Sequence, residues 1–66
     1  MKNLIKVERA KLNMTQQDLA DAVQVSRQTI NSIETGRYVP STILALKISD
    51  IFKRSVNEIF ELEKTD

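Results

Sequence analysis

Hydrophobic residues recur along this chain every three or four positions, the period of an amphipathic α-helix. The spacing predicts one all-α domain spanning residues 1–66, with helices at about residues 3–12, 16–23, 27–35, 42–53 and 56–60. The segment FELE that begins at Phe60 resembles a short extended strand, and the residues after it are polar. The pattern therefore favours a helical protein in which the only candidate strand is a short C-terminal one.

Polar capping residues mark where four of these helices begin. Ser and Thr side chains accept hydrogen bonds from free N–H groups in the first turn, and an acidic residue three positions later completes a capping box. The candidate caps are Thr15 with Asp18, Ser26, either Ser41 or Thr42, and Ser55 with Glu58.

Helix ends are marked by residues that tolerate left-handed backbone. Asn13 and Gly36 follow the first and third expected helices, where such a conformation often ends a helix. Gln24 and Lys53 occupy equivalent positions after the second and fourth, where glycine would relieve strain. We expect one or both at positive φ, at a cost of roughly 1 kcal/mol each.

The apolar stripes predict which residues face the core. In the first three helices these are Leu4, Val7 (or Ile5), Leu12, Leu19, Ala22, Val23 with Ala20 close by, Thr29, Ile30 and Ile33. In the fourth they are Ile43, Leu44, Leu46 or Ile48, Ile51 and Phe52.

The opposite face of the helix at 27–35 carries four polar side chains that folding does not require. They are long or polar enough to reach base edges in a DNA groove, although a solvated surface helix offers the same pattern. The four residues are Arg27, Gln28, Asn31 and Ser32.

Composition excludes several classes of function. The chain has 66 residues with no cysteine and no histidine, which removes disulfides, thiolate metal sites and the commonest catalytic base. No nucleophile–base pair, glycine-rich phosphate loop or metal-ligand set is present, so neither an enzyme nor a cofactor, metal or small-molecule ligand is expected. No apolar run approaches the roughly 20 residues of a membrane span, and no signal-peptide core is present. We therefore expect a soluble cytoplasmic protein.

Net charge is only +1, but it is unevenly distributed. Residues 1–40 carry six basic and four acidic side chains, a net +2, and residues 41–66 carry four basic and five acidic, a net −1. So small an excess predicts modest non-specific affinity for phosphates without excluding DNA binding.

The segment TQQDLADAVQVSRQTINSIETGRYVPS resembles the helix-turn-helix of the Cro-like phage-repressor family, also called the XRE family. The frame T-Q-x-x-L-A, a short turn, then S-x-x-x-I-x-x-I-E-x-G is matched, and the similarity continues through LALKI and NEIF over nearly the whole chain. Gln24 and Lys53 depart from it, since the family usually has glycine there. The resemblance implies a compact, lambda-repressor-like five-helix bundle whose third helix enters the major groove while the second crosses the backbone.

The resemblance also implies roles for individual residues. The polar quartet should contact bases, because Arg pairs with guanine O6 and N7 and Gln or Asn with adenine N6 and N7. Arg9 and Glu34 should form an internal salt bridge, and Gln16 should brace the third helix as well as touch a phosphate. The expected phosphate contacts are Gln16, Gln17, Thr35, Arg37, Tyr38 and Ser41.

The implied function is that of a sequence-specific, double-stranded-DNA-binding transcriptional regulator. The resemblance further implies a repressor that acts as a homodimer on a palindromic operator. Four side chains on one half-site offer too few contacts, which favours pairing of half-sites. The alternative is a protein-binding adaptor or antitoxin with the same fold. Expected dimer residues are Val56, Ile59, Phe60 and Leu62, although the first three could instead complete the monomer core and leave Leu62 alone exposed.

Overall fold

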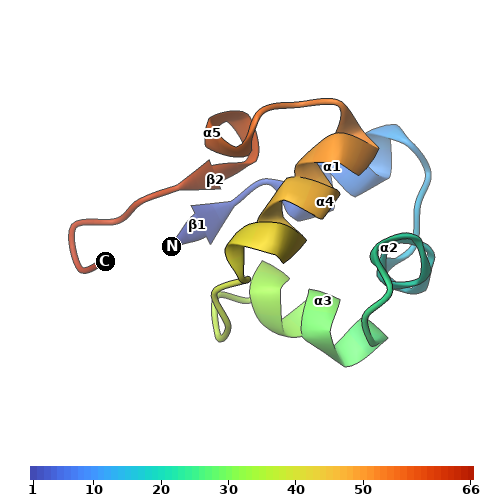
Figure 1. The fold of residues 1–66 in the computed structure, drawn as a ribbon, viewed down its shortest axis with the longest axis horizontal. Helices are drawn as coiled ribbons and strands as arrows, with labels where there is room; N and C mark the ends of the chain where they lie inside the picture. The colour runs from blue at the N-terminus through green and yellow to red at the C-terminus, as the bar shows by residue number, and fades with distance from the viewer.

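Five short helices and a two-stranded sheet make up the computed structural model, which describes residues 1–66. In chain order the elements are β1 (Lys2–Asn3), α1 (Ile5–Lys11), α2 (Gln16–Val23), α3 (Arg27–Glu34), α4 (Thr42–Phe52), α5 (Val56–Ile59) and β2 (Phe60–Glu61). Figure 1 shows α2 and the two strands at opposite ends of the molecule, with α4 crossing between them. The all-α architecture with five helices is thus confirmed, and a small sheet is added to it.

The helix starts are determined by the predicted caps. The backbone N–H of Asp18 donates to Thr15 Oγ1 (2.9 Å), and the Thr15 N–H donates back to Asp18 Oδ2 (3.0 Å), which closes a capping box. The Thr29 N–H donates to Ser26 Oγ (3.1 Å) at the start of α3. Leu44 N–H donates to Ser41 Oγ (3.1 Å), so Ser41 and not Thr42 caps α4.

Four residues adopt the left-handed conformation where helices end. Gly36 has φ +79°, and the non-glycine residues Asn13, Gln24 and Lys53 have φ +54°, +63° and +54°. Both positions predicted to be strained are therefore left-handed. Packing of the helices on either side offsets the cost of roughly 1 kcal/mol at each non-glycine position.

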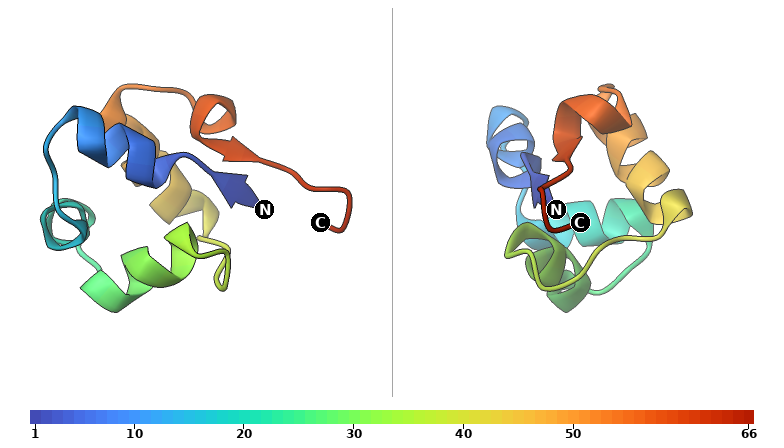
Figure 2. Two further views of the ribbon diagram at one scale, coloured as in Figure 1. Left: turned by 180° about the vertical axis from the view of Figure 1, so that it is seen from behind. Right: turned by 90° about the vertical axis from the view of Figure 1, so that its left-hand side faces the viewer.

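The N-terminal strand was not predicted. Lys2 and Asn3 pair antiparallel with Glu61 and Phe60, and Leu4 N–H donates to the Ile59 carbonyl (2.9 Å). The first helix therefore begins at Ile5 rather than at residue 3. A two-residue strand has no hydrophobic period of its own, and its partner lies almost sixty residues away, so only the folded chain reveals it. The two termini lie side by side in both views of Figure 2.

The core contains residues from every helix and from β2. Its members are Ile5, Leu19, Ala20, Val23, Ile30, Ile33, Leu44, Ile48, Phe52, Ile59 and Phe60. Several expected core residues are instead exposed: Leu4 and Val7 (each 49% exposed), Leu12, Ala22, Ile43 and Leu46. The alternatives given for two of them, Ile5 for Val7 and Ile48 for Leu46, are the ones that are buried.

The first helix is rotated relative to the prediction because its inward face is largely charged. Ile5, Glu8 and Arg9 point toward the protein, and Glu8 is buried while Lys11 Nζ (3.0 Å) and Arg54 Nε (3.8 Å) neutralise its carboxylate. An apolar stripe cannot reveal a helix that turns ion pairs inward. The error in α4 has another cause, since that helix is apolar on several sides and its pattern does not select one.

Candidate nucleic-acid interface

Helices α2 and α3 are joined by three residues and pack on each other more extensively than any other pair of elements. The left-handed Gln24 reverses the chain, the Val25 N–H donates to the Ala20 carbonyl (3.0 Å), and Ser26 caps α3. The buried side chains of α3 are Ile30 and Ile33. Its other face lies along an outer edge of the molecule in Figures 1 and 2.

The four polar residues singled out from the sequence all lie on this outer side of α3. Arg27 and Gln28 are exposed, and Asn31 and Ser32 one turn later are half-buried. None belongs to the core. The structure therefore leaves this polar face available for contact with another molecule.

A hydrogen-bonded chain runs from the interior to this face through Gln16, the first residue of α2. Gln16 Nε2 donates to Glu34 Oε1 (3.3 Å) and to Asn31 Oδ1 (3.1 Å). Its Oε1 accepts from Arg27 Nη1 (3.5 Å). Gln16 thus braces α3, and it connects two of the four candidate base-contacting residues.

At its inner end, this series of hydrogen-bonded side chains reaches an ion pair between α1 and α3. Arg9 Nε donates to Glu34 Oε2 (2.7 Å) and Arg9 Nη2 to Glu34 Oε1 (3.0 Å), and the side chains are only 13% and 7% exposed. Hydrogen bonding to Glu34 raises the pKa of Arg9 above its ordinary value, although burial opposes the shift. Arg9 Nη1 also donates to the Met14 carbonyl (2.8 Å), so this arginine links α1, the following turn and α3.

The other side of the same face forms a shallow polar hollow of about 300 Å³. It is lined by Ser26, Gln28, Thr29, Ser32 and Tyr38. The backbone N–H groups of Arg37 and Tyr38 both donate to the Ser32 carbonyl (2.9 and 3.2 Å), which folds the connector after α3 back beside the helix. Tyr38, a candidate phosphate contact, thereby lies next to two candidate base contacts.

The remaining phosphate candidates differ in how free their side chains are. Arg37 is exposed and forms no ion pair, whereas Thr35 Oγ1 donates to the Asn31 carbonyl (2.9 Å). Gln17 Nε2 donates to Asp21 Oδ1 (2.8 Å) in its own helix. Ser41 Oγ accepts from the Leu44 N–H, which leaves the hydroxyl proton free to be donated. All four are exposed.

Two of the four expected dimer residues lie inside the single chain. Ile59 and Phe60 are 1% and 7% exposed and belong to the core, and Val56 packs against it. Leu62 alone is strongly exposed, as the alternative interpretation stated. The physical reason is that α5 has a single turn, and its apolar residues are needed to close the core over α4.

A different apolar surface lies on the connector and α4, and it includes Ile43 and Leu46, which the sequence had placed in the core. We call it the connector–α4 surface and define it by Val39, Ile43, Leu46 and Val56. The first three are 58%, 69% and 55% exposed. A hollow of about 200 Å³ within it is lined by Met1, Val39, Pro40, Thr42, Ala45, Leu46, Val56 and Phe60.

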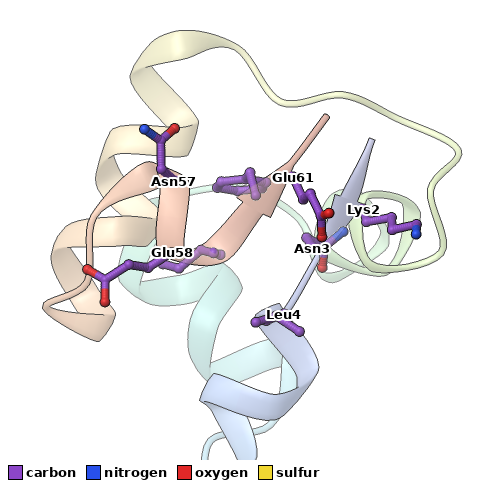
Figure 3. A pocket seen from close by; sticks show the side chains of 8 residues that line it. Lys2, Asn3, Leu4, Asn57, Glu58 and Glu61 are labelled. Carbon is purple, nitrogen blue, oxygen red and sulfur yellow. The ribbon is translucent and has the colours of Figure 1, made fainter. Parts of the chain in front are cut away.

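A third hollow, of about 390 Å³, lies between the sheet and α5 (Figure 3). Figure 3 shows the Glu58 carboxylate and the Lys2 ammonium at opposite sides of it, so its charged groups do not converge on one point. Glu58 accepts from the Ser55 N–H (2.9 Å), which together with nearby Arg54 lowers the pKa of Glu58. Its carboxylate is therefore already used in capping α5.

No group of acidic side chains is arranged to bind a metal ion. The longest helix, α4, has 11 residues, and no helix has the length and hydrophobicity needed to span a bilayer.

Comparison with known proteins agrees with this geometry. A family model described as helix-turn-helix matches residues 5–59. The chain is 45% identical over 64 residues to YgzD of Bacillus subtilis, an uncharacterized HTH-type transcriptional regulator, with 97% of each chain covered. It is 51% identical over 63 residues to an uncharacterized HTH-type transcriptional regulator of Methanocaldococcus jannaschii, with 96% of each covered. A third such protein, from Archaeoglobus fulgidus, is 44% identical over 66 residues, covering all of this chain and 93% of the relative.

Proposed function

The chain belongs to the Cro-like (XRE) helix-turn-helix family, and from this membership we propose that it is a transcriptional regulator that binds double-stranded DNA in a sequence-specific manner. In this proposal α3 lies in the major groove and α2 crosses the phosphate backbone. Relatives from Bacillus subtilis and Methanocaldococcus jannaschii are named as HTH-type transcriptional regulators, which supports the proposal.

The observation that carries the proposal is the outer face of α3. Arg27, Gln28, Asn31 and Ser32 occupy one side of a capped helix, and the core does not need them. An α-helix fits the width of the major groove, and these side-chain types offer the donors and acceptors that distinguish base pairs there. Exposed Gln17, Thr35, Arg37, Tyr38 and Ser41 flank this face, at positions suited to phosphates.

We further propose that the protein acts as a homodimer on a palindromic operator. One copy has only four candidate base contacts, and pairing two copies doubles them at half-sites about 34 Å apart. The connector–α4 surface supports this, because its apolar side chains gain by burial against a second copy. The longest dimension of the molecule is 31 Å, which is close to the roughly 34 Å between half-sites one helical turn apart.

Repression is the regulatory mode we propose, because a dimer that covers two successive major grooves on one side of the duplex blocks access to that stretch of promoter. We also propose that the protein is cytoplasmic, where a DNA-binding regulator of this family is expected to act. The alternative, an adaptor or antitoxin that mainly binds another protein, makes different predictions about salt and sequence dependence.

Selection of bound duplexes from a random pool tests the proposal directly. The protein should enrich one inverted-repeat sequence, and its affinity for that sequence should fall steeply as salt concentration rises. Arg27→Ala should weaken binding by about 1–3 kcal/mol and relax the preference at one base pair. Arg37→Ala, a matched arginine outside α3, should weaken all sequences about equally. Absence of both enrichment and salt dependence would favour the adaptor.

A further inference from the structure

The side chain of Gln16 lies between Glu34, which can only accept hydrogen bonds, and Arg27, which can only donate them. Glu34 is bonded to Arg9 through both carboxylate oxygens and acts only as an acceptor. The Gln16 atom beside it must therefore be the amide nitrogen Nε2 (3.3 Å). Arg27 has no acceptor, so the Gln16 atom facing Arg27 must be Oε1. Two independent neighbours thus determine the same orientation of the Gln16 amide.

This orientation in turn determines the orientation of Asn31. Gln16 Nε2 donates to Asn31 across 3.1 Å, so the Asn31 atom that receives this bond is the oxygen Oδ1. A two-point contact with adenine requires Oδ1 and Nδ2 side by side at the base edge. Because Oδ1 is directed at Gln16, the Nδ2 group is the part of Asn31 that remains for DNA.

We propose that Gln16 is a specificity-determining positioning residue, which orients Asn31 so that only its N–H donors face DNA and guanine is preferred over adenine there. Guanine presents two acceptors, N7 and O6, in the major groove, whereas adenine presents one acceptor beside a donor and cytosine presents only a donor. Arg27 is oriented by the same glutamine. Its Nη1 contacts Gln16 Oε1, which leaves the Nε–Nη2 edge for a second guanine.

The inference rests on the proposed function and changes one expectation from residue type, namely that asparagine pairs with adenine. The same side chain on an unbraced helix would be free to rotate and read adenine. No hydrogen bond within the chain restrains the Gln28 amide, so adenine remains the expected partner of Gln28.

The test compares the duplexes selected by the wild type, Asn31→Ala, Gln16→Met and Gln17→Met. Asn31→Ala should flatten the preference at one base pair, which identifies the base that Asn31 contacts. In the wild type that base should be guanine, favoured over adenine by roughly tenfold. Gln16→Met should bring the two to within about twofold of each other at that position, because Asn31 regains its rotation. The matched Gln17→Met, one residue away on α2, removes a candidate phosphate contact, so it should weaken all sequences about equally and leave the guanine preference unchanged.

The contrary outcomes are separable. A wild type that selects no sequence overturns the proposed function and this inference together. A selected site with adenine at the position that Asn31→Ala flattens overturns the inference alone, as does an Asn31→Ala variant that weakens every sequence equally. A Gln16→Met variant that keeps the full guanine preference also overturns the inference. Far-UV circular dichroism verifies that each variant is folded, and the wild-type and Asn31→Ala selections decide the guanine assignment even if Gln16→Met does not fold.

Discussion

Neutralising Glu34 should destabilise the protein far more than neutralising an exposed carboxylate. Its carboxylate accepts two hydrogen bonds from Arg9 and one from Gln16, and only 7% of its side chain is exposed. At an effective dielectric constant of about 20, two unit charges about 4 Å apart attract by about 4 kcal/mol. Glu34→Gln removes this attraction and leaves the Arg9 guanidinium partly buried without a counterion.

We expect Glu34→Gln and Arg9→Met each to lower the free energy of unfolding by about 3–5 kcal/mol. A chain of this size is typically stable by about 3–10 kcal/mol, so either variant should be partly unfolded at 25 °C or close to it. The double variant leaves no buried charge without a partner. It should therefore lose much less stability than the two single losses added together.

Urea unfolding followed by far-UV circular dichroism measures these losses, at one fixed protein concentration because association would raise the apparent stability. Arg37→Met is the matched control for Arg9→Met, since Arg37 is exposed and forms no ion pair, and it should change stability by less than about 0.5 kcal/mol. Single losses below about 1 kcal/mol that simply add in the double variant would refute the argument that this pair joins α1 to α3.

Three other features of the structure lead to measurable predictions. Gln24→Gly and Lys53→Gly should each raise the free energy of unfolding by about 0.5–1 kcal/mol, because both residues have positive φ; an unchanged urea midpoint would contradict this. The pKa of Glu58 is lowered from 4.5, so its contribution to stability is present above about pH 4.5 and is lost as pH falls through the folded-state pKa. Glu58→Gln should accordingly flatten the acid limb of a stability–pH profile, and an unaltered limb would mean that another group controls it. Leu46→Asp should shift the protein toward monomer in sedimentation; a dimer that resists this change but dissociates with Leu62→Asp would place the interface at the C-terminal segment instead.

The local features of the candidate site were predictable because they depend on neighbours in sequence. The caps at Thr15, Ser26 and Ser55 each bond a group three residues away, and Gln24 and Gly36 end helices that their own flanks specify. The polar face of α3 follows from the same helical period. Such interactions are complete within one or two turns, so the sequence contains all the information they need.

The hydrogen bonds made by the polar face of α3 could not be predicted from the helical period. Residue types suggested adenine for Asn31, and only the position of Gln16 across the α2–α3 packing directs the Asn31 oxygen toward the Gln16 amide nitrogen. The resemblance to the family suggested that Gln16 braces α3. The resemblance did not predict how the amides of Gln16 and Asn31 are oriented. That orientation depends on Glu34 and therefore on Arg9 in α1.

The amino-acid sequence by itself determined where the five helices lie, how they begin and end, and which side of α3 is polar, because these follow from short-range hydrogen bonds and a 3.6-residue period. Tertiary structure alone decided that α1 turns Glu8 and Arg9 inward, that Ile43 and Leu46 of α4 lie on the surface, and that the two ends of the chain pair as strands. Each of these outcomes is a choice between faces or partners of similar local energy. Contacts between residues distant in sequence make that choice, since a buried charge is tolerated only where its counterion is supplied by another element.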